Sequence, residues 1–475
     1  MYRTDSFYID GQWVAPIDRQ CFELVNPATE VAYGKLAMGS KADVDKAVAA
    51  ARKALPEYRA WSVDARRELL VRIVDIYQRR SEEFAQAMTL EMGSPINFSR
   101  AGQVPRGTAH FNEMIRVLGE FEFDKRQGNT LIRHEAIGVC GLITPWNWPI
   151  NQVAVKVAPA LAAGCTIVLK PSEFSALSAL LFAEVLDEAG VPPGVFNLVN
   201  GFGRTVGHAI SAHPDIDMVS FTGSTAAGIT VAKTAAETVK RVAQELGGKS
   251  ANVLLPDVPL KEAVTKGVAA CFTNSGQSCS IPTRMLVPRE LMDEAAGYAR
   301  EAAQVFNVGS PDDASTQLGP LVNGAQWQRV QHLIQTGLDE GASLIHGGLG
   351  KPQGLDKGFY ARPTVFANVT PTMTIAQEEI FGPVLSMIPY SSVDEAIEIA
   401  NGTPYGLAAY VQSTDLENAR LVAQKLHAGA VHLNYPPADF GAPFGGVKRS
   451  GNGREWGEHG LREYLEVKAV VGHWR

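Results

Sequence analysis

The sequence lacks a block of positive charge, a long apolar run and a signal-like N-terminus, and each absence excludes a class of protein. The formal net charge is -7, which argues against a nucleic-acid partner, because such partners require a concentrated basic face. No window of about 18 uninterrupted apolar residues occurs, so we expect no membrane span and no membrane partner. The first residues show no basic region followed by an apolar stretch, so we expect a cytoplasmic protein without a signal peptide.

The cysteines are few, odd in number and widely spaced, and no CxxC pair occurs. This pattern disfavours both a disulfide framework and a zinc site, so we predict reduced thiols and no bound metal. The five positions are Cys21, Cys140, Cys165, Cys271 and Cys279.

What is present is a chain of 475 residues, too long for one hydrophobic core. Apolar residues at helical spacing run from about 42 to 116, and residues 120–135 read as a hairpin that turns near Gly128. Strand-like and helix-like segments then alternate from 139 to 248, which predicts a Rossmann-like parallel sheet with crossover helices. A second alternation from about 250 to 435 predicts a second α/β domain, and the last residues read as an exposed strand.

Two glycine-containing loops follow predicted strands. "FTGSTAAG" places Gly223 and Gly228 where a strand meets a helix, a turn that presents backbone N–H groups to an anion. "GFGRTVG" misses the GxGxxG pattern by one residue, and either loop alone is more often a plain turn. Their position at the carboxyl ends of successive strands favours a nucleotide site, and Glu173 of "LKPSE" could accept hydrogen bonds from a ribose.

Cys279 stands in the polar loop "FTNSGQSCSI", beside glycine, glutamine and two serines. Most lone cysteines are inert, and a structural cysteine is usually a small buried hydrophobe. A polar loop that solvent or a ligand can reach favours a nucleophile instead.

Seven motifs occur in the order that the aldehyde dehydrogenase superfamily has them, and the chain resembles that superfamily from about Tyr8 to Val471. The motifs are "TPWNWP", "LKPSE", "FTGSTAAG", "QELGGKS", "SGQSC", "EEIFGPV" and "PFGGVKRSGNGREWG". The resemblance implies an NAD-binding domain at 1–117 and 137–248, a catalytic domain at 249–457, and a small β arm for oligomerisation at 118–136 and 458–475. By the same resemblance we expect a homodimer or a homotetramer.

The resemblance also implies the chemistry. Cys279 would attack the aldehyde carbon, and the side chain of Asn147 with the backbone N–H of Cys279 would hold the oxyanion. Hydride transfer to NAD would leave a thioester, which water activated by Glu245 would hydrolyse. Lys156 and Glu466 match positions that help to relay the proton.

The implied cofactor contacts extend along the whole nucleotide. NAD is predicted over NADP, which remains possible, because the Glu173 carboxylate would repel a 2′-phosphate. The implied residues are Ile143, Pro145, Trp146, Lys170, Ser172, Glu173, Gly203, Gly207, Phe221, Gly223, Ser224, Leu246, Gln326, Arg329, Glu379 and Phe381.

Three alternatives stay open at this point. A thiol protease or acyltransferase would need a histidine base, and none of the ten histidines lies in a motif. A coenzyme-A-acylating enzyme would not need Glu245, and a non-catalytic relative would not need to keep Cys279. The expected substrate tunnel carries no charge, which favours a neutral aliphatic or aromatic aldehyde, although the direction of nearby Arg284 is open. The expected lining residues are Trp148, Gln152, Val155, Ile281 and Phe440.

Overall fold

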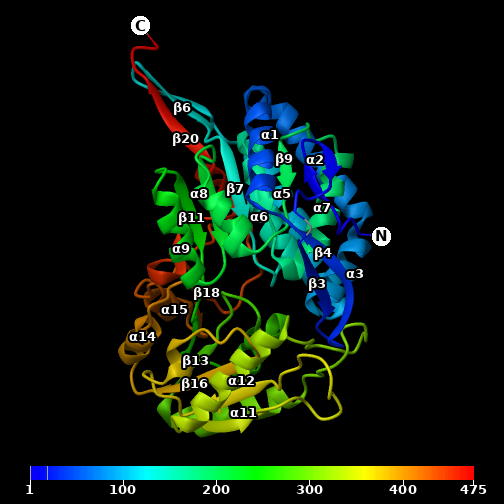
Figure 1. Ribbon diagram of the computed structural model, residues 1–475. Coiled ribbons are helices and arrows are strands. Elements are labelled where there is room, and N and C mark those ends of the chain that lie inside the picture. Colours follow the sequence, from blue (N-terminus) through cyan, green and yellow to red (C-terminus); the bar gives the residue numbers. More distant parts are fainter. Residues whose placement is uncertain (1, 19, 475) are drawn as a thin grey trace.

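The computed structural model describes residues 2–18 and 20–474, and four β-sheets organise this part of the chain. Figure 1 shows two α/β bodies, one above the other, and a narrow β arm that leads away from the upper body toward the C-terminus. Met1, Arg19 and Arg475 fall within the expected domain limits but lie outside the described residues. Among the described residues, no helix is both long and apolar enough to cross a membrane.

The upper body is built on an eight-stranded sheet whose five central strands are parallel. This confirms the Rossmann-like alternation predicted from the sequence. The strands, in sheet order, are β19 (Gly451–Asn452), β11 (Arg241–Glu245), β10 (Met218–Thr222), β7 (Val139–Ile143), β8 (Thr166–Lys170), β9 (Phe196–Leu198), β1 (Phe7–Ile9) and β2 (Gln12–Val14).

Helices cover both faces of this sheet, and their apolar sides form its core. They are α1 (Lys41–Arg59), α2 (Val63–Arg79), α3 (Ser81–Met92), α4 (Ile96–Phe98), α5 (Val104–Leu118), α6 (Pro149–Ala163), α7 (Ala176–Glu188), α8 (His208–Ala212), α9 (Thr225–Ala236) and α16 (Gly457–Glu463). A π-helical turn, η1 (Ser99–Gln103), leads into α5, and a second one, η3 (Gly203–Gly207), leads into α8.

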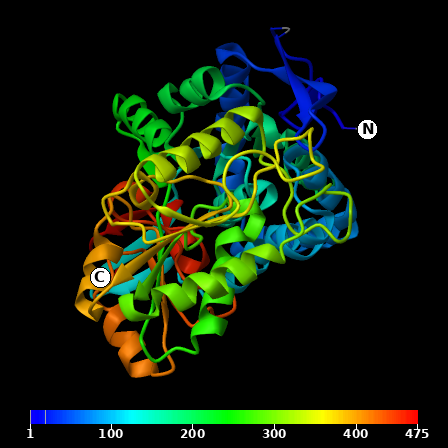
Figure 2. The ribbon, with the colours of Figure 1, turned by 90° about the horizontal axis from the view of Figure 1, so that it is seen from below.

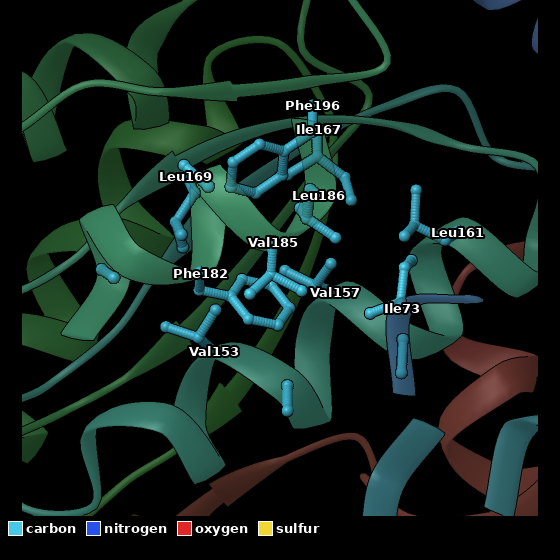
Figure 3. Packing of buried hydrophobic residues seen from close by; sticks show 14 of the residues in the cluster. Ile73, Val153, Val157, Leu161, Ile167, Leu169, Phe182, Val185, Leu186 and Phe196 are labelled. Carbon is cyan, nitrogen blue, oxygen red and sulfur yellow. The ribbon is translucent and has the colours of Figure 1, made fainter. Parts of the chain in front are cut away.

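The centre of this core lies where α6 and α7 pack on β8 and β9. Every residue of α6 is buried, as expected for a helix that is apolar on all sides. Figure 3 shows its side chains meeting those of α2, α7 and the sheet. The labelled residues are Ile73, Val153, Val157, Leu161, Ile167, Leu169, Phe182, Val185, Leu186 and Phe196.

The lower body is a seven-stranded sheet that is parallel except for its edge strand β14. Its strands are β14 (Ser343–His346), β15 (Thr364–Ala367), β16 (Val384–Tyr390), β13 (Arg284–Pro288), β12 (Ala251–Leu254), β17 (Ala408–Gln412) and β18 (Ala430–Leu433). Figure 2, seen from below, shows the helices of this body around the sheet: α10 (Leu260–Phe272), α11 (Met292–Gln304), α12 (Gly324–Asp339), α13 (Thr374–Gln377), α14 (Val393–Asn401) and α15 (Leu416–Ala423).

The arm is a three-stranded antiparallel sheet in which the predicted hairpin pairs with the C-terminal strand. It consists of β5 (Asp124–Gln127), β6 (Thr130–Ala136) and β20 (Leu465–Val470). A separate hairpin of β3 (Gln20–Asn26) and β4 (Val31–Met38) was not predicted. Nor was the pairing of β19 with β11, which returns a segment of the expected catalytic domain to the first sheet.

Candidate active site

The carboxyl ends of three neighbouring strands bring the predicted site residues to one edge of the upper sheet. Ile143 ends β7 and pairs with Phe221 of β10, whose next residue, Thr222, pairs with Glu245 at the end of β11. The loops after β7 and β11 contact the lower body, through the hydrogen bonds of Asn147 to Gln277 and of Gly248 to Glu379. Binding and catalytic residues commonly lie at this edge of a parallel sheet, because all its strands end there.

Cys279 reaches this edge from the lower body through a tight turn, η4 (Thr273–Gly276). Asn274, Ser275 and Gly276 all adopt left-handed backbone conformations, with φ of 55°, 54° and 73°. A Cβ on Gly276 would lie 2.1 Å from the carbonyl carbon of Gly382, so only glycine fits there. The turn leaves Cys279 half-buried in the lining of a cavity of about 530 Å³.

Asn147 lies against the same loop. Its side-chain Nδ2 donates to the carbonyl oxygen of Gln277 at 3.0 Å. Its own carbonyl oxygen accepts from Asn274 Nδ2 at 2.7 Å and from Gln103 Nε2 at 3.3 Å. Asn147 and Cys279 therefore line one cavity, with the main chain of Asn147 fixed by two buried amides.

Gln103 and Asn274 were missed by the sequence analysis. Gln103 ends the π-helical turn η1 and also donates to Asn274 Oδ1 at 3.2 Å. Such single π-turns often occur at functional sites. The signal in the sequence was the asparagine of "FTNSGQSC", but nothing in the sequence indicated that Gln103 would reach it.

Glu245 ends β11 and is 4% exposed, and neither carboxylate oxygen has a hydrogen-bond partner among the described residues. Oε1 lies 2.7 Å from the place that a Cβ on Gly445 would occupy, so the glycine leaves room for the carboxylate. Burial raises the pKa of Glu245 well above its ordinary value, and the charge of Glu455 raises it further. A raised pKa makes a carboxylate a stronger base, so Glu245 is a candidate general base.

Lys156 is buried behind this carboxylate, and its partner is Glu455. Lys156 Nζ donates to Glu455 Oε1 at 2.5 Å and to Ser220 Oγ at 2.9 Å. The prediction that Glu466 joins Lys156 is wrong. Glu466 lies on β20 of the arm, where it is half-exposed and pairs with Arg241 at 2.6 Å. Glu455 lies in "GNGREWG", the end of the last motif that carries the family resemblance. The sequence analysis chose Glu466 of the terminal strand instead.

The cavity extends from Cys279 along the loops that were predicted to hold a dinucleotide. Of the sixteen positions predicted for the cofactor, nine line it: Pro145, Trp146, Gly223, Ser224, Leu246, Gln326, Arg329, Glu379 and Phe381. Thr222, Tyr405 and Arg449 also line it and were missed. Both bodies contribute, so the cavity spans the junction between them.

Contacts among the lining residues hold Gln326, Glu379 and Phe381 in place. Gly248 N–H donates to Glu379 Oε1 at 3.0 Å, and burial raises the pKa of Glu379 to about 7. Gln326 Nε2 donates to the carbonyl oxygen of Phe381 at 2.9 Å. Trp146 meets the Phe381 ring edge to face at 5.4 Å between centroids. An acceptor carboxylate and a flat aromatic wall fit a ribose and its attached ring.

The remaining cofactor candidates lie along the sheet edge, outside the lining of the cavity. Lys170 ends β8, and its Nζ is 3.7 Å from Glu173 Oε2. Gly207 packs close to Lys170, and Ser172 Oγ accepts from the N–H of Phe174. A Cβ on Gly203 would meet nothing within 4 Å, so this loop leaves open space beside the sheet. Ser224 caps α9, whose N-terminal N–H groups face the cavity and suit a pyrophosphate.

Electrostatics oppose spontaneous ionisation of the nucleophile. Burial raises the pKa of Cys279 well above its ordinary value, and the charges of Glu379 and Glu245 add to the rise. The thiol is therefore protonated in this environment, so attack requires that its proton be removed.

Arg284, whose direction the sequence left open, is turned away from the site. Its guanidinium donates to the carbonyl oxygens of Lys249, Ile399 and Ala400 at 2.9, 2.7 and 2.8 Å. It is a structural residue of the lower body. Val155 and Ile281 are buried, and Gln152 lines the cavity.

Comparisons with known proteins show the family of this chain. A sequence profile of the aldehyde dehydrogenase family matches residues 13–470. A curated relative from Pseudomonas sp, 3-succinoylsemialdehyde-pyridine dehydrogenase, is 53% identical over 468 residues, which cover 98% of each chain. Aldehyde dehydrogenase C from Pseudomonas syringae, solved as a cysteine-to-alanine variant with NAD+ and octanal, is 56% identical with a TM-score of 0.98, covering 99% of this chain and 97% of that one. An aldehyde dehydrogenase from Mycobacterium tuberculosis complexed with NAD+ is 40% identical with a TM-score of 0.96 over 98% of both chains.

The chain therefore belongs to the aldehyde dehydrogenase family. It is an NAD(P)-dependent oxidoreductase that oxidises aldehydes, and the resemblance stated from the sequence is confirmed.

Proposed function

We propose that this enzyme oxidises an aldehyde to the carboxylic acid through a thiohemiacetal and a thioester on Cys279, and that water cleaves the thioester. The observation that carries the proposal is the shared cavity. Cys279 and Asn147 both line it, and Glu245, whose carboxylate is buried without a partner among the described residues, is close enough to raise the thiol pKa.

In the first step the sulfur of Cys279 bonds to the aldehyde carbon, and the carbonyl π electrons move to the oxygen. Asn147 Nδ2 and the backbone N–H of Cys279 stabilise that oxyanion, because fixed donors need no reorganisation when charge develops. The thiol proton leaves to solvent in the cavity as the bond forms, and Glu245 serves only the later hydrolysis.

The bound NAD supplies the hydride acceptor for collapse of this adduct to the thioester. Glu379 and Gln326 would hold the nicotinamide end, while Gly223 and Ser224 would meet the pyrophosphate. Lys170 and Glu173 would meet the adenosine ribose, and the Glu173 carboxylate favours a 2′-hydroxyl over a 2′-phosphate, hence NAD over NADP.

Glu245 then takes a proton from water as the water attacks the thioester carbon, and the sulfur of Cys279 leaves as a thiolate that takes the proton of the carboxylic acid product. A base in this role typically contributes about 10²–10⁴-fold. The Lys156–Glu455 pair behind Glu245 carries the proton onward. Because Glu245 is available to activate water, water is favoured over coenzyme A as the acyl acceptor.

The substrate is proposed to be a neutral aldehyde with an aliphatic or aromatic body. The expected tunnel residues are apolar or neutral, and the relatives named above include a dehydrogenase of a pyridine-bearing semialdehyde and a complex with octanal. A buried carboxylate on the substrate would need a cationic partner, and Arg284 does not supply one.

We also propose a homodimer or homotetramer in the cytoplasm. The arm exposes every side chain of β5, and Val467 and Val471 are 62% and 82% exposed. Soluble proteins normally cover such edges, so a second subunit is the expected cover. The five cysteines are free thiols, which suits a reducing compartment.

The test is NADH formation from simple aldehydes, with and without coenzyme A, using Cys279→Ala as the variant without a nucleophile. We expect turnover without coenzyme A and none in Cys279→Ala. Strict dependence on coenzyme A would reject hydrolysis, and substantial turnover in Cys279→Ala would reject the nucleophile.

A further inference from the structure

A cluster of aromatic side chains lies beyond Trp148, next to the nucleophile loop. Trp148 Nε1 donates to Oγ of Ser278, the residue before Cys279, at 2.8 Å. On α5, His110 shares a hydrogen bond of 2.8 Å with Asn151, three residues after Trp148 on α6. The members of this cluster, called the aromatic mouth below, are Phe98, His110, Trp148, Phe440, Phe444 and Trp456.

Four rings of the aromatic mouth are partly exposed. The rings of Phe440 and Trp456 lie 5.1 Å apart, and Phe444 stacks on Trp456 at 4.9 Å. These three rings and Phe98 are only half-buried, although large aromatic side chains normally contribute to a core. Half-exposed aromatic clusters on soluble proteins commonly mark a binding surface.

Arg106 of α5 stands against the Trp148 ring of this cluster. Its guanidinium carbon lies 4.4 Å from the centroid of the Trp148 ring, and one N–H donates to the carbonyl oxygen of Gly102 in the preceding turn. Within residues 2–18 and 20–474, no acidic side chain forms an ion pair with it. Arg284, which pairs with no carboxylate among the described residues, uses its donors on three carbonyl oxygens instead.

The carboxylates on neighbouring elements are engaged elsewhere. Glu113, one turn further along α5, pairs with Arg116 at 2.6 Å. Asp439, in the loop before Phe440, accepts from the N–H of Gly441 at 2.9 Å. Burial lowers the pKa of His110 to about 4, so its ring is neutral at working pH and adds no second charge. Most N–H donors of Arg106 are therefore available to a ligand.

We propose that Arg106 is a specificity-determining residue that donates hydrogen bonds to an acceptor group at the far end of the aldehyde, whose body lies against the aromatic mouth. This inference rests on the proposed oxidation of an aldehyde through Cys279, and where the acceptor is a carboxylate it replaces the neutral substrate proposed above. The acceptor is a carbonyl oxygen, a heteroaromatic nitrogen or a carboxylate. A plain alkanal would leave these donors without a substrate partner.

The test compares kcat/KM for three aldehydes of equal chain length: hexanal, 5-oxohexanal and 6-oxohexanoate. Hydrogen bonds to a charged group predict a preference for at least one acceptor-bearing member of about tenfold to a hundredfold over hexanal. Arg106→Met keeps the length of the side chain and should abolish that preference through KM, while hexanal changes less than about threefold. Arg79→Met, an exposed arginine paired with Glu188, is the matched control and should change none of the three.

Arg106→Gln, which keeps an N–H donor without the charge, separates the acceptors. It should retain part of a preference for 5-oxohexanal and lose one for 6-oxohexanoate. Equal efficiencies for all three aldehydes in the wild type would overturn the inference, and so would an equal fall for all three in both Arg106 variants. If no aldehyde is oxidised by the wild type, the proposed function fails instead, which is a different result.

Discussion

Lys156 and Glu455 form a buried ion pair of 2.5 Å although 299 residues separate them in the chain. Both lie close enough to Glu245 to change its pKa, Glu455 raising it and Lys156 lowering it. The base proposed for thioester hydrolysis is therefore tuned by two opposite charges that also neutralise each other.

The first prediction concerns the pH dependence of kcat. Glu455→Gln removes the charge that raises the pKa of Glu245 and frees Lys156 to lower it, so the acid limb of the profile should move to lower pH. Lys156→Met removes the lowering charge, so the same limb should move to higher pH. Both shifts follow because Glu245 must lose its proton before it can act as a base.

Glu466→Gln is the control for this pair, because Glu466 lies on the arm and pairs with Arg241. Its profile should match the wild type. Shifts of the same sign in Glu455→Gln and Lys156→Met, or a shift in Glu466→Gln alone, would contradict the assignment.

The second prediction concerns Gln103 as a positioning residue. Gln103→Leu removes the hydrogen bonds to Asn147 and Asn274 that fix the oxyanion donor. Complete loss of one such donor costs about 10²–10³-fold in kcat, so a displaced donor should cost about tenfold or more. NAD affinity should not change, and Gln86→Leu, an exposed amide on α3, should behave as wild type. A lowered melting temperature with unchanged kcat would make Gln103 merely structural.

The parts of the site that the sequence could predict are those carried by local motifs. Cys279, Asn147 and the loop at Gly223 each lie in a short run whose residue types fit their chemistry. Gln103, by contrast, acts through a π-helical turn that its neighbours in sequence do not signal. Glu455 and Glu466 both precede apolar residues near the C-terminus, and only the folded chain shows that Glu455 is the one that pairs with Lys156. Long-range pairing of this kind is invisible to periodicity.

The fold, too, was predictable only where its sequence signals are local. Strand and helix alternation indicated both parallel sheets, because each crossover unit is local in sequence. The return of β19 to β11 was not predictable, since two residues carry no periodic signal.

The third prediction concerns the cofactor. Glu173 should favour NAD in the wild type, and Glu173→Gln should raise the ratio of kcat/KM for NADP to that for NAD, because the repulsion of a 2′-phosphate is removed while Lys170 remains. Steady-state kinetics with both cofactors measure this ratio. A wild type that uses both equally would contradict the role of Glu173.

The fourth prediction concerns assembly. Light scattering should show a dimer or tetramer, and Val467→Glu should shift it toward the monomer, because a charge would replace an exposed apolar side chain of β20. Val239→Glu, at a residue 91% exposed outside the arm, is the control and should not shift it. A monomeric wild type would contradict the arm as an interface.

The fifth prediction, on Glu245, tests the central claim most directly: the pre-steady-state formation of NADH by Glu245→Gln after rapid mixing with NAD and an aldehyde that the wild type oxidises. If Cys279 forms the thioester and Glu245 serves its hydrolysis, the variant should release a burst of about one NADH per active site and then stall as acyl-enzyme. Steady turnover at the wild-type rate would show that Glu245 is not the hydrolytic base, and absence of any burst would show that it acts before the hydride leaves.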